Sequence, residues 1–232
     1  MTLLTLRVLG PLQVAVADAP PSTLESDKAR ALLAFLAVEA DRPHRREALI
    51  GLLWPDCPEQ TARHNLRQTL FNIRQAIGDH TATPPYLLIS HDEIQFNAAS
   101  DYALDLAQFN TLFSACDKQL PHCLEDCPIR AERLAQAVEL YRGQFLEQFF
   151  LQDSAAFEEW ALVQRALGAL AYLANYQEQH GDYQLDPWRE EAHRQMMRVL
   201  ALSGQPSTAL KQEVRGEQSC KRFQARNGDI RN

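Results

Sequence analysis

The chain has 232 residues, of which 46% are apolar and 23% charged, a composition typical of globular rather than disordered proteins. It has no apolar run of the roughly 18 residues that a membrane span needs, and its N-terminus lacks a signal-peptide pattern. Five cysteines in a chain of this length argue against a secreted disulfide scaffold. We therefore expect a reduced, cytoplasmic protein that does not enter membranes.

Charge is unevenly distributed along the chain. The net charge is −7, but residues 1–80 hold nine Lys and Arg against nine Asp and Glu. Residues 81–232 hold fourteen against twenty-one and carry the whole acidic excess. An acidic total therefore does not exclude a local basic face in the first part of the chain.

The first 53 residues predict a hairpin and two helices. Apolar residues alternate with other residues on both sides of a break at Gly10-Pro11, which indicates two short strands within 3–16. Ser26 can cap a helix that runs to about Ala40. A second helix is expected from Arg46 to Leu53, and Trp54-Pro55 ends it. Its inward residues are expected to be Leu49, Ile50, Leu52 and Leu53.

The third helix has the clearest pattern in the chain. Asp56 reads as its N-cap, Pro58 as a first-turn proline and Gly78 as the residue that ends it after Ile77. One side of this helix is apolar, with Ala62, Leu66, Leu70, Ile73 and Ile77. The other side holds Arg63, Arg67 and Arg74 within about 40° at 100° per residue, extended by His64, Gln68 and Gln75, with Asn65 and Asn72 beyond them.

A second hairpin is predicted over residues 86–97, with its tip at Ser90-His91-Asp92-Glu93. After residue 100 the strand patterns end, and helices are expected near 105–118, 129–141, 154–180 and 188–203. Residues 101–200 hold sixteen acids against eight Lys and Arg. This acidity is typical of a solvated helical surface, and it also fits a protein-docking module.

The order of helix, helix, arginine-bearing helix and hairpin is that of a winged helix-turn-helix. Arg can bind guanine or phosphate in the major groove, and Asn or Gln can read adenine. Cations near the helix starts suit backbone phosphates. The candidate DNA-contacting residues are Lys28, Arg45, Arg46, Arg63, His64, Asn65, Arg67, Gln68 and Arg74. A solvated amphipathic helix with scattered surface charge is the alternative, and the two acids at the hairpin tip do not suit entry into a minor groove.

The sequence offers no support for an enzyme. It contains no phosphate-binding loop, no H-E-x-x-H pattern and no G-x-S-x-G pattern. The spacing of Cys116, His122, Cys123 and Cys127 matches no usual zinc pattern. We therefore expect no catalytic residues, no cofactor and no metal.

Two groups of segments follow one another in a recognisable order. The N-terminal segments are 5–10 (TLRVLG), 28–37 (KARALLAFLA), 52–56 (LLWPD) and 62–74 (ARHNLRQTLFNIR). Further segments are 105–109 (DLAQF), 140–146 (LYRGQFL), 157–160 (FEEW) and 189–193 (REEAH). Over roughly residues 3–211 the chain thereby resembles the SARP-like bacterial transcriptional regulators. The further segments look like the bacterial transcriptional activator domain that follows the DNA-binding part in that family.

The resemblance implies an α+β OmpR-type winged helix-turn-helix in residues 1–99, followed by an all-α, tetratricopeptide-like helical domain in 100–211. It also implies binding to double-stranded promoter DNA, often at direct repeats, and contact with RNA polymerase. A homodimer on DNA is left open. Larger relatives append ATPase or sensor domains, and we expect no ATP-driven switch here.

Three features depart from the family pattern. Arg45 replaces the Ser-like cap of the second helix, which costs about 1 kcal/mol of capping but adds a cation. About a dozen residues are missing between Gly181-Asp-Tyr183 and the Leu-Asp-Pro turn that ends at Pro187. Residues 212–232 lack apolar periodicity and are expected to form a disordered tail.

The last two departures lead to the hypothesis that the DNA-binding half is intact and the activation half impaired. A different class of function also fits the acidic total, namely a helical protein-interaction adaptor without specific DNA binding. Salt-dependent binding to duplex DNA distinguishes the two.

Overall fold

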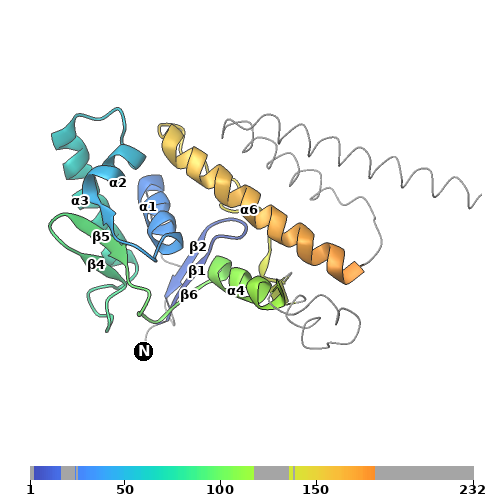
Figure 1. The fold of residues 1–232 in the computed structure, drawn as a ribbon. Helices are drawn as coiled ribbons and strands as arrows, with labels where there is room; N and C mark the ends of the chain where they lie inside the picture. Colours follow the sequence, from blue (N-terminus) through green and yellow to red (C-terminus); the bar gives the residue numbers. More distant parts are fainter. Residues whose placement is uncertain (1–2, 17–23, 25, 118–135, 138, 181–232) are drawn as a thin grey trace, which may run out of the picture. The chain divides into compact units, whose positions relative to one another are not determined.

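The computed structural model describes residues 3–16, 24, 26–117, 136–137 and 139–180, and gives the backbone alone for 113–117, 167 and 169–180. The chain divides into two compact units, residues 1–164 and 165–232. In the described part, two three-stranded sheets accompany five helices (Figure 1), so the predicted mixture of α and β structure is confirmed.

The first sheet has the strand order β2-β1-β6. Strands β1 (Leu4–Arg7) and β2 (Gln13–Val16) pair antiparallel, which confirms the predicted N-terminal hairpin. Strand β6 (Tyr102–Leu104) pairs parallel with β1. The expectation that strand patterns end at residue 100 is therefore wrong. A three-residue strand has too little periodicity to recognise in sequence, and it exists because β1 supplies its hydrogen bonds.

The end of β1 is extended by a segment from far along the chain. Gly10 has φ +112°, and a Cβ at this position would lie 3.3 Å from the Cβ of Arg142, so both the conformation and the close approach favour glycine. Its amide donates to the carbonyl of Gln144 at 3.0 Å, and the amide of Leu146 donates to the carbonyl of Val8 at 2.8 Å. Residues 142–147 thus dock on the N-terminal sheet.

Helices α1 (Asp27–Val38) and α2 (Arg46–Leu53) lie where the sequence predicts them. Ser26 has the extended conformation of an N-cap, although its side chain makes no capping hydrogen bond. Helix α1 is buried along most of its length. In α2 only Leu49 and Leu53 of the four predicted inward residues are fully buried.

Helix α3 (Glu59–Ala76) begins later than predicted. Its N-cap is Pro58, with φ −53° and ψ 141°, so the assignment of Asp56 as N-cap is wrong. A proline amide has no hydrogen, and proline therefore suits an N-terminal position where no hydrogen bond is required. At the other end Gly78 has φ +66°, and its amide and that of Asp79 donate to the carbonyls of Gln75 and Arg74. These two hydrogen bonds close the helix where a glycine was predicted to end it.

The second sheet has the order β3-β5-β4. Strands β4 (Leu87–Ile89) and β5 (Glu93–Phe96) form the predicted second hairpin. Strand β3 (His44–Arg45) pairs with β5 just before α2 begins. It was not predicted, because two residues carry no alternation.

Two further helices follow. Helix α4 (Asp105–Asp117) and helix α6 (Ala155–His180) match the predictions near 105–118 and 154–180. The predicted helix at 188–203, most of the one at 129–141, the missing segment before Pro187 and the tail at 212–232 lie outside the described residues.

Residues 154–160, at the start of α6, pack on α1 and α2 within the first unit. The indole of Trp160 lies 5.0 Å from the ring of Phe35 and donates to Glu39 Oε1 at 3.0 Å. The hydroxyl of Ser154 donates to the carbonyl of Leu52.

Candidate nucleic-acid interface

Helix α3 buries one side and exposes the other. The predicted apolar residues are all buried, with exposures of 4% or less: Ala62, Leu66, Leu70, Ile73 and Ile77. Arg63, His64, Arg67 and Gln68 are exposed. We call these four residues the outer face of α3. Burial of the apolar side fixes the helix against α1 and α2 and therefore directs the outer face to solvent.

The arginines of the outer face have weak partners or none. Arg63 Nη2 lies 2.7 Å from Glu59 Oε1 and 3.7 Å from Glu47 Oε1, and all three side chains are more than half exposed. Exposed ion pairs of this kind are worth about 0–1 kcal/mol, so a phosphate or a base can replace them. Arg67 is exposed and makes no ion pair with the described part of the chain.

Arg74 lies at the C-terminal end of the same helix but has an intramolecular partner. Its Nε donates to Asp79 Oδ2 at 2.7 Å, and the Asp79 side chain is 0% exposed. The other oxygen of Asp79 accepts from the amides of Tyr86 and Leu87 at 2.7 and 3.0 Å. Arg74 thus neutralises a buried carboxylate that joins α3 to the second hairpin.

The amide side chains differ in availability. Gln68 Nε2 donates to Asn72 Oδ1 at 3.0 Å, one turn further along the exposed side of α3. Asn65 is half-buried, at the edge of the outer face. Gln68 therefore needs only to exchange one exposed hydrogen bond in order to meet a base.

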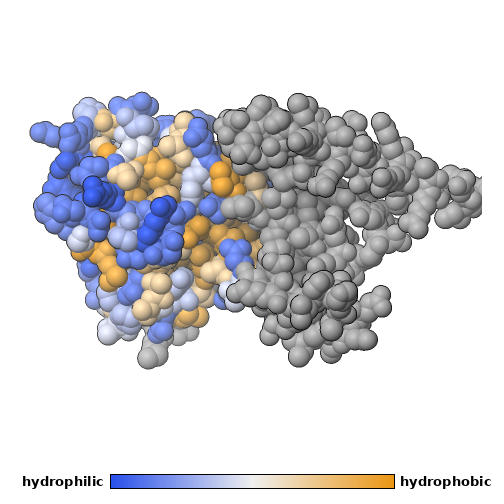
Figure 2. Space-filling view, viewed as in Figure 1, coloured by the Kyte–Doolittle hydropathy of each residue, from blue (hydrophilic) through white to orange (hydrophobic). Residues whose placement is uncertain are grey.

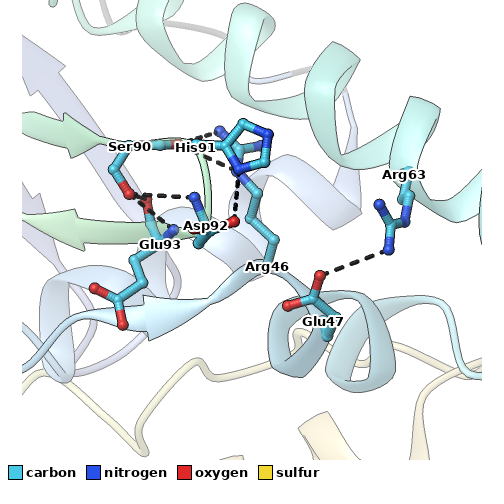
Figure 3. A network of polar contacts seen from close by, with 7 residues as sticks. All are labelled: Arg46, Glu47, Arg63, Ser90, His91, Asp92 and Glu93. Carbon is cyan, nitrogen blue, oxygen red and sulfur yellow. Dashed lines mark hydrogen bonds and ion pairs between the residues drawn. The ribbon is translucent and has the colours of Figure 1, made fainter.

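The start of α2 is linked to the tip of the second hairpin (Figure 3). Arg45 is the N-cap of α2 and makes no side-chain capping bond, so the predicted loss of a cap is confirmed. The backbone amide of Arg46 donates instead to the carbonyl of Asp92 at 2.9 Å, and its guanidinium donates to the carbonyl of Ser90 at 2.9 and 3.3 Å. The hairpin thus satisfies one of the free amides at the start of the helix.

The hairpin tip is itself ordered by a serine. Ser90 Oγ accepts from the amides of Asp92 and Glu93 at 3.3 and 2.9 Å. His91 Nδ1 lies 2.6 Å from Asp92 Oδ1, and both side chains are exposed. The tip is fixed beside α2, but its exposed carboxylates do not favour contact with phosphates.

Lys28 lies away from the other candidates, on the packed side of α1. Its Nζ donates to the carbonyl of Leu53 and to Asp153 Oδ1, the second at 2.7 Å, and its side chain is only 15% exposed. The cation is therefore engaged by its own chain. The structure brings together Arg63, His64, Arg67 and Gln68, sets Arg45 and Arg46 at the base of the hairpin, and separates Lys28 from both groups.

One exposed apolar residue on α3 is absent from the candidates derived from sequence. Phe71 is 53% exposed although it belongs to an apolar residue type. It lies about 80° from Arg63 at 100° per residue, on the polar side of the helix. The helical position alone could have identified it. Figure 2 shows that hydrophilic residues cover most of the surface over α2, α3 and the second hairpin.

The described residues hold no group of side chains that could bind a metal and no helix that could span a membrane. They contain no cluster of three His, Cys, Asp or Glu side chains able to hold a metal. The side chains of the cysteine cluster, Cys116, His122, Cys123 and Cys127, lie outside the described residues. None of the described helices combines the length and the apolar character needed to cross a bilayer.

Comparison with known proteins adds two findings. Residues 104–215 match the family described as "Bacterial transcriptional activator domain". Over 218 residues the chain is 27% identical to the transcriptional regulatory protein EmbR of Mycobacterium tuberculosis and of Mycobacterium bovis, covering 88% of this chain and 54% of the relative. The chain thus spans about half the length of the curated relatives it matches.

A solved structure of EmbR is also similar to this chain. The structure titled "Mycobacterium tuberculosis EmbR in complex with low affinity phosphopeptide" aligns with a TM-score of 0.57 and 25% identity, over 94% of this chain and 60% of that chain. The proteins and the family that the chain matches are regulators of transcription. An activator-domain sequence over 104–215 and similarity to EmbR along most of this chain support the resemblance to SARP-like bacterial transcriptional regulators.

Proposed function

We propose that this chain binds double-stranded promoter DNA in the bacterial cytoplasm through the outer face of α3. In this proposal residues 1–99 form an OmpR-type winged helix-turn-helix, and residues 100–211 form a tetratricopeptide-like helical domain that contacts RNA polymerase. Residues 212–232 form a tail outside both. The regulator acts by binding alone, without catalysis or a cofactor.

One observation carries the DNA-binding proposal: α3 presents an exposed Arg67 beside a weakly paired Arg63, opposite a fully buried apolar side. An α-helix is about 10–12 Å wide with its side chains, and the major groove of B-DNA is about 12 Å wide. Guanidinium groups can contact guanine or phosphate there without breaking any strong internal bond. His64 and Gln68 lie beside them as further donors.

Contacts to the DNA backbone are proposed for the start of α2. Arg45 is exposed at the N-cap, and the positive end of the helix dipole adds to its charge. Arg46 contributes chiefly by holding the hairpin tip next to this end. Two of the nine sequence candidates, Lys28 and Arg74, have internal partners and are assigned structural roles instead.

Fluorescence anisotropy tests the proposal. The purified chain is titrated onto labelled DNA from upstream of its own gene and onto a scrambled duplex, at two salt concentrations. We expect preference for the native duplex and weaker binding at high salt, because phosphate contacts release counterions. The double variant Arg63→Ala/Arg67→Ala is expected to lose roughly tenfold or more, since a single bidentate base contact is worth about 1–3 kcal/mol.

The matched control is Arg42→Ala. Arg42 is also an exposed arginine, but it pairs with Glu39 at 2.9 Å, on the side of α1 that packs against Trp160. Its removal is expected to leave DNA affinity unchanged. Equal losses in both variants would indicate general charge attraction. Absence of binding to either duplex at low salt would support the alternative, a protein-interaction adaptor, which the acidic net charge of −7 favours.

The activation half requires a separate test. The missing segment before Pro187 and the altered residues after 211 support a proposal that activation is impaired while DNA binding is retained. Limited proteolysis is expected to cleave residues 100–210 faster than 1–100, because a helical pair that lacks a partner exposes its apolar face. Equal resistance of the two regions, or full stimulation of transcription on the bound promoter, would contradict it.

A further inference from the structure

Phe71 is an apolar side chain that α3 does not bury. It is 53% exposed, whereas Leu66, Leu70 and Ile73 on the same helix are exposed by 4% or less. Full burial of such a side chain stabilises a fold, and about half of that contribution is absent at this position. Single exposed apolar residues are common on protein surfaces, so the surroundings of Phe71 must decide its meaning.

The position of Phe71 aligns it with the outer face. It follows Arg67 by four residues and Arg63 by eight, and residues at this spacing succeed each other along one side of a helix. Helical side chains lean toward the N-terminus, so the ring is directed over the turn that bears Arg67. Arg74, one turn beyond, is bound to Asp79 at 2.7 Å. The row on α3 is therefore cation, cation and aromatic ring.

The charges beside the ring restrict what can cover it. An apolar protein surface would have to remove water from the exposed Arg67 and Arg63 without replacing their hydrogen bonds, which is costly. DNA satisfies both chemistries at once, because phosphates and guanine accept from guanidinium groups while thymine presents a methyl group in the major groove. Thymine is the only one of the four bases with such an apolar group at that edge.

We propose that Phe71 is a specificity residue that contacts the 5-methyl group of a thymine in the bound sequence. This inference rests on the proposed function, in which α3 enters the major groove. The arginines supply affinity and the ring supplies discrimination at one position. The ring contact adds no hydrogen bond and therefore depends entirely on the methyl group.

The experiment replaces thymines of the bound duplex by deoxyuridine, one position at a time. Deoxyuridine pairs with adenine as thymine does but lacks the methyl group. For the wild-type chain we expect one or two positions at which affinity falls roughly fourfold, the effect of one buried methyl-sized group. Phe71→Ala is expected to bind the thymine and deoxyuridine duplexes equally at those positions, and Phe71→Leu to retain part of the preference.

Folding does not confound this comparison. Phe71 is largely exposed, and alanine favours helices more than phenylalanine does, so the melting temperature of Phe71→Ala is expected to match that of the wild type. The coupling between Phe71 and the methyl group is read as a double-mutant cycle. A cycle term of zero at every thymine, with binding still dependent on Arg67, would overturn the inference alone. Failure of the wild type to bind any duplex would overturn the proposed function and this inference with it.

Discussion

The two sides of the three-helix region differ in how their polar groups are used. On the outer face of α3, Arg63 and Arg67 have only exposed local partners or none in the described chain. On the opposite side, Lys28 of α1 and Glu39 near its end bind Asp153 and Trp160, more than 100 residues away. A basic residue near a helix start can thus serve DNA or its own chain, and only the partner distinguishes the two.

Sequence motifs that lie far apart along the chain contact each other in the folded structure. The N-terminal Leu-Gly pair at residues 9–10 and the segment 142–147 form hydrogen bonds with each other. Asp105, at the start of α4, accepts from the amides of Val8 and Leu9 at 2.8–3.0 Å, and Arg142 lies 3.5 Å from it. Motifs that are about 130 residues apart in sequence therefore form one contact region, which we call the joint: residues 8–10, Asp105 and residues 142–147.

The largest expected effect concerns that joint. Asp105→Ala leaves the buried amides of Val8, Leu9 and Leu106 without this acceptor and Arg142 without its counter-charge, at a cost of about 3 kcal/mol. Urea denaturation should show the loss in the unfolding free energy. The exposed Asp101 serves as control, and Asp101→Ala is expected to change stability by less than about 0.5 kcal/mol. Similar results for the two variants would show that the joint is not a stability element.

Loss of an aromatic contact is expected to have the next largest effect. The Trp160 ring lies 5.0, 5.5 and 5.4 Å from the rings of Phe35, Phe145 and Phe157. Trp160→Ala should cost about 2–3 kcal/mol, below the full-burial value because the side chain is half-buried. Trp160→Phe keeps an aromatic ring at this position but removes the hydrogen bond to Glu39, and should cost about 1 kcal/mol. Thermal denaturation of both variants measures the difference.

A direct test compares one cation from the packed side, Lys28, with one from the outer face of α3, Arg67. Lys28→Ala should lower the unfolding free energy by about 1 kcal/mol, through the loss of its bonds to Leu53 and Asp153, and leave DNA affinity unchanged. Arg67→Ala should leave stability unchanged and lower DNA affinity roughly tenfold. The pair of assays is denaturation and anisotropy on the same preparations. If Lys28→Ala weakened DNA binding more than Arg67→Ala, the two sides would have been assigned the wrong way round.

The smallest expected effect is a gain. Arg45→Ser places a hydroxyl at the N-cap of α2, where the backbone is extended and no side chain caps the helix, and should add about 0.5–1 kcal/mol to stability. The same change removes a cation from the side proposed to face DNA and should lower DNA affinity severalfold. If the variant showed no gain in stability and no loss of DNA affinity, Arg45 would have neither the capping effect nor the DNA-binding role proposed for it.

Sequence reasoning succeeded where one element's own pattern decides its structure. The bounds of α2 and the buried side of α3 follow from apolar spacing, and Gly78 ends α3 as its type and place predict. It failed where structure depends on distant partners. Strand β6 requires β1 and strand β3 requires β5, while Asp56 was chosen as a cap although Pro58 holds that position.

The candidate site divides in the same way. The amino-acid sequence by itself determined which residues share the outer face of α3, because the angle between helical positions is a property of the helix alone. Only the tertiary structure decided which cations remain available, since Lys28 and Arg74 are engaged by Asp153 and Asp79. It also fixed the exposed fraction of Phe71, which its place on the polar side of α3 only suggests. The physical reason is that exposure and pairing depend on what other segments cover, and periodicity within one helix carries no information about those segments.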